Sequence, residues 1–184
     1  MRVLRMVLAF EAIAVALWLG GLITLGAIVA PTVFGMVPAP TSADAMTVVF
    51  QRFDRLAMTA AMLALLCEVA SAKLRPTVTL LDLGRAGFLV VMAGLAIVQG
   101  AVFTPEIASL HHRGAIRGSG ELGLRLETVH VRSEVAGKAQ FALGVAFFGL
   151  LVSPGGLPQG KKKDSGGEPN EPEPKEPKPS DPDA

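Results

Sequence analysis

The chain has 184 residues, of which 51% are hydrophobic, and its mean hydropathy of +0.48 is high for a water-soluble domain. A formal net charge of +1, without a basic stripe and interleaved aromatic residues, argues against a nucleic-acid partner. The single cysteine, Cys67, excludes an intrachain disulfide and a cysteine metal cluster. This composition predicts one apolar helical bundle followed by a polar tail.

The first apolar segment follows Arg2 and Arg5, and we expect it to cross a membrane over about residues 6–30. About 20 apolar residues are enough to span the hydrocarbon core. A secretory signal peptide is the alternative. However, the run is longer than a typical apolar signal region, and Glu11 and Trp18 are unusual inside one. We therefore predict a retained transmembrane helix.

Prolines shape the predicted link to the second crossing. Pro31 is expected to end the first helix, because proline lacks a backbone N–H and clashes with the preceding turn. The segment Thr41-Ser-Ala-Asp44 has the spacing of a capping box, which would start the next helix outside the bilayer. We expect the chain between them to fold over the bundle mouth, as an outer lid formed by Pro31, Phe34 and Pro105.

The remaining apolar segments predict three further crossings, separated by a charged turn over Lys73–Arg85 and a glycine-rich loop over Gly114–Gly120. Gln99 is expected to form a hydrogen bond to another helix. Arg52, Asp54 and Arg55 would either pair with Glu106 or Glu127 or bind anionic lipid headgroups. The fold class is thus an all-α, integral membrane four-helix bundle with helices extended on the outer side. Its crossings are expected at about residues 6–30, 56–73, 86–103 and 134–153.

The composition changes near the C-terminus, which divides the chain into a membrane domain over residues 1–155 and a tail over residues 156–184. The tail is rich in proline, glutamate and lysine and has no large apolar residue from Lys161 onward, so we predict that it is disordered. It is either a solvated end or an arm that binds a partner. The density of Lys and Arg near helix ends favours cytoplasmic termini, and the membrane is expected to be the bacterial inner (cytoplasmic) membrane.

Two acidic residues interrupt the apolar crossings, and they form the candidate intramembrane acid pair Glu11 and Glu68. Both lie five to eight residues from the predicted inner ends of their helices, so they could share one level of the bundle. A carboxylate at this depth is costly and usually faces the bundle, a partner or water. The pair is either a proton or cation site or a structural pair bonded to its neighbours.

A second group of polar residues is expected on the outer side. Glu127, His130 and Glu134 share one helical face, and Glu127-x-x-His130 is half of a carboxylate-bridged metal motif. The second half of that motif is absent from the sequence, so we assign no metal site. A solvated charged helix face is the main alternative. The candidate outer polar cluster comprises Glu106, His111, His112, Glu127, His130 and Glu134.

Several short motifs resemble a known family. They are Trp18-Leu-Gly-Gly21, Val29-Ala-Pro-Thr-Val-Phe34, Phe50, Phe103-Thr-Pro-Glu-Ile107 and His130-Val-Arg-Ser133. In these residues the chain is similar to the bacterial four-helix membrane domain related to eukaryotic transmembrane protein 205. The resemblance covers roughly residues 4–153. It implies a four-crossing helical bundle without an assigned activity.

No catalytic constellation is present in the sequence, so we predict neither an enzyme nor a cofactor. The first functional hypothesis is small-solute or ion transport, or membrane homeostasis. The second is a non-catalytic accessory or scaffold subunit of a membrane complex. The third is an outer-face metal-binding protein. The expected partners are the lipid bilayer and either a membrane protein or a second copy. The contact would run through small-residue helix faces such as Ala12, Ala16 and Gly20.

Overall fold

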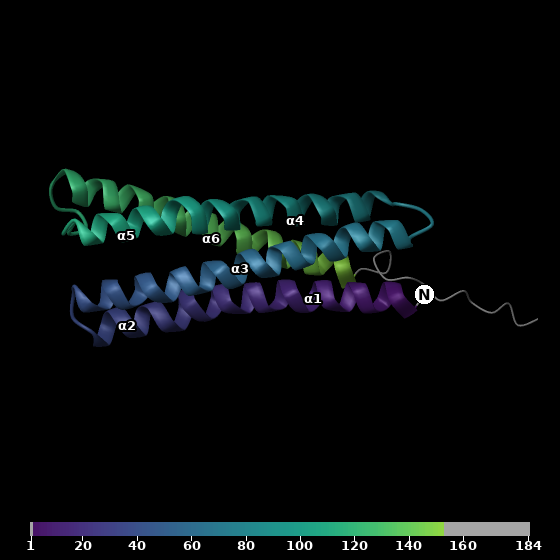
Figure 1. The fold of residues 1–184 in the computed structure, drawn as a ribbon, viewed down its shortest axis with the longest axis horizontal. Helices are drawn as coiled ribbons and strands as arrows, with labels where there is room; N and C mark the ends of the chain where they lie inside the picture. Colours follow the sequence, from purple (N-terminus) through teal and green to yellow (C-terminus); the bar gives the residue numbers. More distant parts are fainter. Residues whose placement is uncertain (1, 153–184) are drawn as a thin grey trace, which may run out of the picture.

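The computed structural model describes residues 2–152, and every regular element within that range is a helix (Figure 1). The predicted tail over residues 156–184 lies outside the described residues. The elements, including two π-helical stretches labelled η, are α1 (Arg2–Ile23), η1 (Thr24–Val29), α2 (Ala30–Met36), α3 (Thr41–Leu74), α4 (Leu80–Val98), η2 (Gln99–Phe103), α5 (Thr104–His112) and α6 (Gly120–Val152).

The elements form four continuous rods of 33 to 35 residues, each long and apolar enough to cross a membrane. At about 1.5 Å per residue, each rod is about 50 Å long, whereas the hydrocarbon core is about 30 Å thick. The rods must therefore extend beyond the bilayer, and the predicted all-α four-helix membrane bundle is confirmed. We call the end that carries Arg2, the α3–α4 connection and Val152 the terminal end, and the opposite end the loop end (Figure 1).

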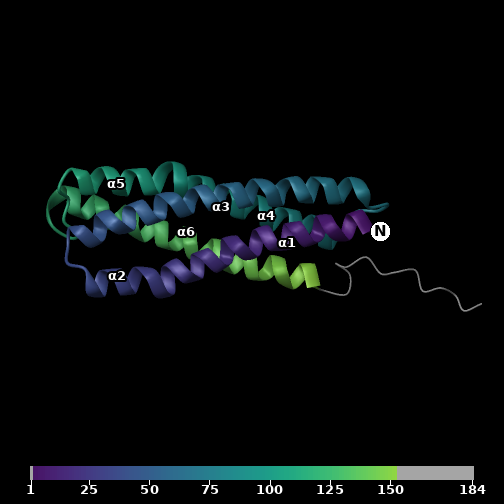
Figure 2. The ribbon, with the colours of Figure 1, turned by 60° about the horizontal axis from the view of Figure 1, so that its bottom comes forward.

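The rods form a closed ring in which neighbours in sequence are also neighbours in space. Helix α3 packs against α1 and α4, and α6 packs against α4 and α1. At the loop end α5 lies between α3 and α6, whereas α2 packs on α3 and makes no contact with α5 or α6. Figure 2 shows α2 standing away from the rest of the bundle. The bundle is thus tightly closed at the terminal end and less so at the loop end.

Small residues allow the helices to approach closely in the middle of the bundle. The core around Trp18 is completed on α3 by the buried residues Ala57, Ala60, Ala61 and Ala64. A Cβ atom on Gly144 of α6 would lie 2.5 Å from the side chain of Leu19, so these two helices meet at a position that only glycine fills without a shift. On α1, by contrast, Ala16 and Gly20 face outward.

Both prolines inside the rods are accommodated by π-helical turns, and the prediction that Pro31 ends the first helix is wrong. The N–H of Ala30 bonds to the carbonyl of Leu25, five residues earlier, and the N–H of Thr104 bonds to that of Gln99. A proline ring normally clashes with the carbonyl four residues before it. Because a π turn is wider than an α turn, the chain passes Pro31 and Pro105 without breaking.

The starts of α3 and α4 also differ from the sequence predictions. Thr41 does not cap α3; Pro40 occupies the N-cap position and makes no side-chain cap. A capping box is instead found at α4, where Thr79 and Asp82 bond to each other's backbone N–H groups. This cap starts α4 at Leu80, so the turn expected over Lys73–Arg85 is shorter and Arg85 belongs to the helix.

The first and third rods share one design. Equivalent residues are 74 positions apart: Gly26 and Gly100 lie in the two π-helical stretches, and Pro31 and Pro105 follow them. The same offset relates Trp18 to Met92, which are both completely buried, and Glu11 to Arg85. The first and third rods, each of which begins a helical hairpin, are therefore similar in these features. At one equivalent buried position the first rod carries an acid and the third a base.

The close contact at Gly144 leads to a stability prediction. Replacing Gly144 with Leu inserts a side chain where Leu19 already lies, so we expect a loss of about 1–3 kcal/mol from overpacking. The matched control is Gly149→Leu on the same helix, because Gly149 faces open space. Thermal unfolding in detergent, followed by circular dichroism, measures both variants. Equal transition temperatures for the two would contradict the close packing of α1 on α6.

Candidate functional site

A cluster of charged side chains is buried near the terminal end, around Arg85. The guanidinium of Arg85 donates two hydrogen bonds to Oε2 of Glu68, from Nε at 3.1 Å and from an Nη at 2.8 Å. Its Nε also lies 3.9 Å from Oε1 of Glu11. Arg85 is 1% exposed and Glu11 is fully buried. One arginine on α4 therefore joins carboxylates from α1 and α3 inside the bundle.

A second ion pair closes this cluster at the helix ends. Arg75, in the α3–α4 connection, pairs with Asp82, which also caps α4 through Thr79. Burial and the nearby charge of Arg85 lower the pKa of Arg75 below the ordinary arginine value. An arginine pKa starts so high that Arg75 still carries its charge at neutral pH. The Arg75–Asp82 ion pair therefore lies between the buried cluster and the membrane surface.

The charges of the cluster do not balance. Asp82 is matched by Arg75 and Glu68 by Arg85, which leaves Glu11 without a base of its own. Neither carboxylate oxygen of Glu11 has a hydrogen-bond partner, although both are buried. The carboxyl group of Glu68 is a close neighbour, and its negative charge opposes a second one at Glu11. Glu11 therefore shares Arg85 with Glu68, and a buried charge that is compensated only in part costs several kcal/mol.

Sequence analysis identified the two acids of this cluster but missed its central base. Glu11 and Glu68 were expected to share a level, and the structure places both beside Arg85. Arg85 was assigned to a turn at the membrane surface, where it would be solvated. The signal that could have found it is the capping box at Thr79 and Asp82, which starts the helix one and a half turns before Arg85.

A layer of apolar side chains separates this cluster from the loop end. It contains Val15 and Trp18 from α1, Ala64 from α3, Met92 from α4 and Phe147 from α6, all with no exposed surface. At the boundary of this layer toward the loop end, the indole N–H of Trp18 donates a hydrogen bond of 3.2 Å to Oε1 of Gln140. This layer closes the bundle to water between its two polar regions.

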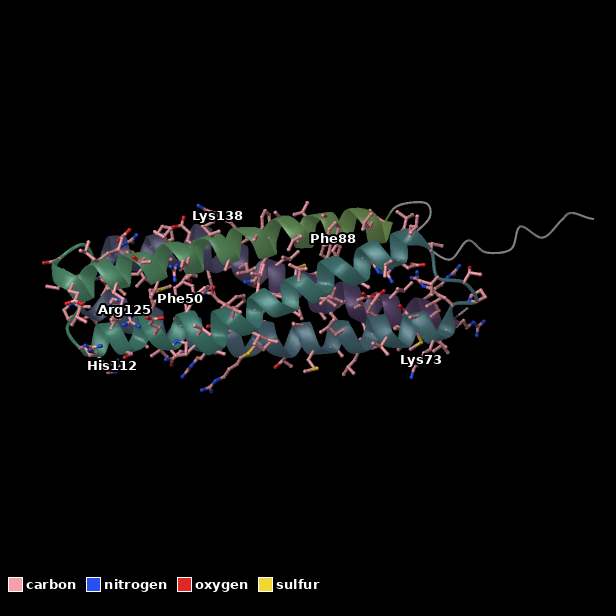
Figure 3. The ribbon with its side chains drawn as sticks, turned by 90° about the horizontal axis from the view of Figure 1, so that it is seen from above. Phe50, Lys73, Phe88, His112, Arg125 and Lys138 are labelled. Atoms are coloured by element: carbon pink, nitrogen blue, oxygen red, sulfur yellow. The ribbon has the colours of Figure 1, made fainter. Side chains whose placement is uncertain are left out.

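Beyond this layer lies a cavity of about 1110 Å³ in the loop-end half of the bundle. Its lining comes from every helical element and from the α5–α6 loop, with Gln140 and Ala57 at its base and Phe34 of α2 among its side walls. Seen from above in Figure 3, Phe50 points into the molecule and Lys138 points away from it. The cavity exists because α2 packs on α3 and leaves α6 uncovered on that side.

Four buried polar atoms without a hydrogen-bond partner belong to residues that line this cavity. They are Oδ2 of Asp54, Oε1 of Gln99, Nδ1 of His130 and Nε2 of Gln140. The amide nitrogen of Gln99 donates to the hydroxyl of Ser133, which confirms the hydrogen bond predicted between helices. Buried polar atoms are normally satisfied, so four unsatisfied ones around one cavity indicate a place where water or a ligand binds.

The predicted outer polar cluster does not come together as one site. Its acids are taken up by separate basic partners: Glu106 pairs with Arg125, Glu127 with Arg117, and Glu134 with Lys138. The hydrogen bonds that Arg117 donates to Glu127 raise the pKa of Arg117. One alternative for Arg52, Asp54 and Arg55 was pairing with Glu106 or Glu127. The described residues show no such pair. Asp54 is instead buried against Thr104 of α5.

The three histidines of that cluster also do not form one site. Nδ1 of His112 lies 2.8 Å from the carbonyl of Ala108 on its own helix. His111 and His130 are neighbours and both line the cavity. Among residues 2–152, however, no three His, Cys, Asp or Glu side chains are close enough together to ligate a metal ion. The metal-binding hypothesis therefore receives no support from this part of the chain.

Four apolar rods enclosing buried charge define a multi-pass integral membrane protein. A family model described as "Domain of unknown function (DUF4149)" matches residues 13–115, which is more than half of the chain, and the chain belongs to this family. The match includes Asp54, Glu68 and Arg85 and leaves Glu11 and α6 outside. No curated protein and no solved structure matches the chain.

The cluster around Arg85 leads to a second stability prediction. Arg85→Met leaves Glu68 buried without its base, so we expect a loss of about 3–5 kcal/mol in the free energy of unfolding. Adding Glu68→Met removes the stranded charge, and the double variant should regain most of that loss. Chemical unfolding in detergent checks both.

Lys138→Met is the control for this experiment, because it breaks an ion pair that is largely exposed and should leave stability unchanged. If the double variant is no more stable than Arg85→Met alone, Glu68 and Arg85 do not compensate each other's burial.

Proposed function

We propose that this protein moves a small solute or ion across the membrane, with Glu11 as a proton site that drives or gates the movement. The observation that carries the proposal is the Glu11 carboxyl group: it is fully buried, has no hydrogen-bond partner and belongs to a cluster with one more acid than base. A buried ionisable residue inside a membrane bundle is by default a functional residue. A proton on Glu11 neutralises the cluster, and its loss restores the imbalance.

The arrangement of the two polar regions supports transport over a purely structural role. A cavity on one side of a closed apolar layer and a titratable cluster on the other are the parts that alternating access requires. The π-helical stretches η1 and η2 lie at the level of the cavity, and such stretches frequently mark functional sites. In this proposal they are the points at which the first and third rods bend.

The loop-end segment α2 is the proposed lid of the cavity. Phe34 lines the cavity together with Phe50 and Phe53, and α2 rests on α3 alone. Pro31 and Pro105 would hold the two bends from which the lid and α5 project. In this proposal, movement of α2 toward α6 closes the cavity.

Proton flux into reconstituted vesicles tests the proposal. With a pH-sensitive dye trapped inside and a potassium diffusion potential, vesicles with the wild-type protein should acidify faster than empty ones. Glu11→Gln should abolish the difference, because glutamine cannot exchange a proton. Glu121→Gln, an exposed acid at the start of α6, is the control and should retain the flux. Wild-type flux no faster than that of empty vesicles, or an unchanged flux in Glu11→Gln, contradicts the proposed role of Glu11.

We further propose in which membrane, and in which orientation, the protein acts. The distribution of Lys and Arg supports the bacterial cytoplasmic membrane, with both termini on the cytoplasmic side and the cavity facing outward. The membrane domain would then end near residue 155, with residues 156–184 as a cytoplasmic tail. The resemblance to transmembrane protein 205 rests on the short motifs alone and adds no activity to this proposal.

A scaffold role is the second candidate, and the exposed small residues of α1 favour it. Ala16 and Gly20 face outward, and nothing lies within 4 Å of a Cβ placed on Gly20. Small residues on a lipid-facing surface let another transmembrane helix approach closely. In this alternative the partner is another membrane protein or a second copy of the chain. Mass measurement of the protein purified in a mild detergent distinguishes a monomer from either complex.

A further inference from the structure

We propose that the loop-end cavity binds a lipophilic organic cation, such as an alkylated or aromatic ammonium compound, with the carboxylate of Asp54 as its counter-charge. This inference deepens the proposed function, since it names the class of solute that would be transported. The binding itself, however, is argued from the cavity and can be measured without any transport.

Asp54 is held rigidly at the wall of the cavity. It is 5% exposed, and the hydroxyl of Thr104 bonds to its carboxylate from α5. A Cβ atom on Gly100 would lie 3.1 Å from Cβ of Asp54, so the absence of a side chain there lets α3 approach η2. Oδ2 is left without a hydrogen-bond partner. A carboxylate oxygen that is positioned but unpaired needs a donor from outside the protein.

Among the charged side chains that line the cavity in the described part of the chain, Asp54 is the one without a partner of opposite charge. Arg117 and Lys138 also line the cavity, but Arg117 is paired with Glu127 and Lys138 with Glu134. Within residues 2–152 no basic side chain pairs with Asp54. Oε1 of Gln99 adds a second hydrogen-bond acceptor without a partner. Nε2 of Gln140 is an unpaired donor in the same lining, but Asp54 carries the formal charge that has no partner, so the lining attracts a cation and disfavours an anion.

The rest of the lining suits the organic part of such a molecule. Four phenylalanines line the cavity, namely Phe34, Phe50, Phe53 and Phe141. Aromatic faces attract organic cations through their π electrons, and the gain increases when water is excluded. A cavity of about 1110 Å³ is large enough for a drug-sized molecule. A small inorganic cation would leave most of this apolar space unfilled.

The position of the cavity also indicates how the molecule would reach it. Phe34 on α2 and Phe141 on α6 are both partly exposed, and these two helices do not touch. A lipophilic cation concentrates at the membrane interface, where its charge remains hydrated while its apolar part enters the lipid. Access between α2 and α6 would thus lead from the bilayer surface directly to Asp54.

A matched pair of probes tests the proposal with the purified full-length protein in a non-ionic detergent. Tetraphenylphosphonium and tetraphenylborate have similar size and shape but opposite charge. Equilibrium dialysis should show saturable binding of the cation and none of the anion. Asp54→Asn keeps the shape of the side chain and should weaken cation binding by about tenfold or more. Asp44→Asn is the control on the same helix, because Asp44 is exposed at the loop end.

The outcomes separate this inference from its alternatives. Equal binding of both probes would show partitioning into an apolar space, and unchanged affinity in Asp54→Asn would show that the carboxylate is not the counter-charge; either overturns the proposal. If Asp54→Asn does not fold, Phe50→Leu replaces it. That variant keeps an apolar wall and should still weaken cation binding, whereas unchanged affinity overturns the proposed aromatic contact. Because no proton gradient is present, a failure of Glu11 to carry protons leaves this result unaffected.

Discussion

The burial of Arg85 between two carboxylates is the constraint on which the closed end of the bundle depends. Charges removed from water must be compensated by one another, and Arg85 can reach Glu68 and Glu11 only if α1, α3 and α4 keep a single register. Apolar packing alone would tolerate sliding of these helices in a bilayer, since lipid is as apolar as the helix faces. The small residues of α3 then allow the approach that the ion pairs require.

At the loop end, the need to pair every backbone N–H and C=O group makes the rods wider instead of drawing them together. The rods must remain continuous, because a broken helix leaves peptide groups without partners, yet each of the first and third rods carries a proline. The π turns before Pro31 and Pro105 solve this locally, and they widen the rods at the level of the cavity. One half of the molecule is thus held by charge pairing and close contact. The other is shaped by two irregular turns that leave room between α2 and α6.

The sequence predicts the fold well, because hydrophobic runs of sufficient length have few alternatives in a membrane. It also predicts the level of Glu11 and Glu68, since helical rise alone sets it. It fails where a contact between distant segments decides the outcome. Whether Arg85 is solvated or buried depends on where α4 begins, and the local charge pattern favoured a turn. Asp54 was expected at the outer surface, either in an ion pair or at lipid headgroups, but the approach of η2 at Gly100 encloses it.

The shared design of the first and third rods explains why the molecule has one polar region on each side of its core. Trp18 and Met92, at equivalent positions, build the same apolar layer. On the terminal side the equivalent residues Glu11 and Arg85 differ in charge, so the two rods attract each other there. On the loop side the equivalent residues Leu25 and Gln99 both border the cavity without pairing. The loop end is therefore the less tightly packed half of the bundle, whereas the charged end is held together by buried ion pairs.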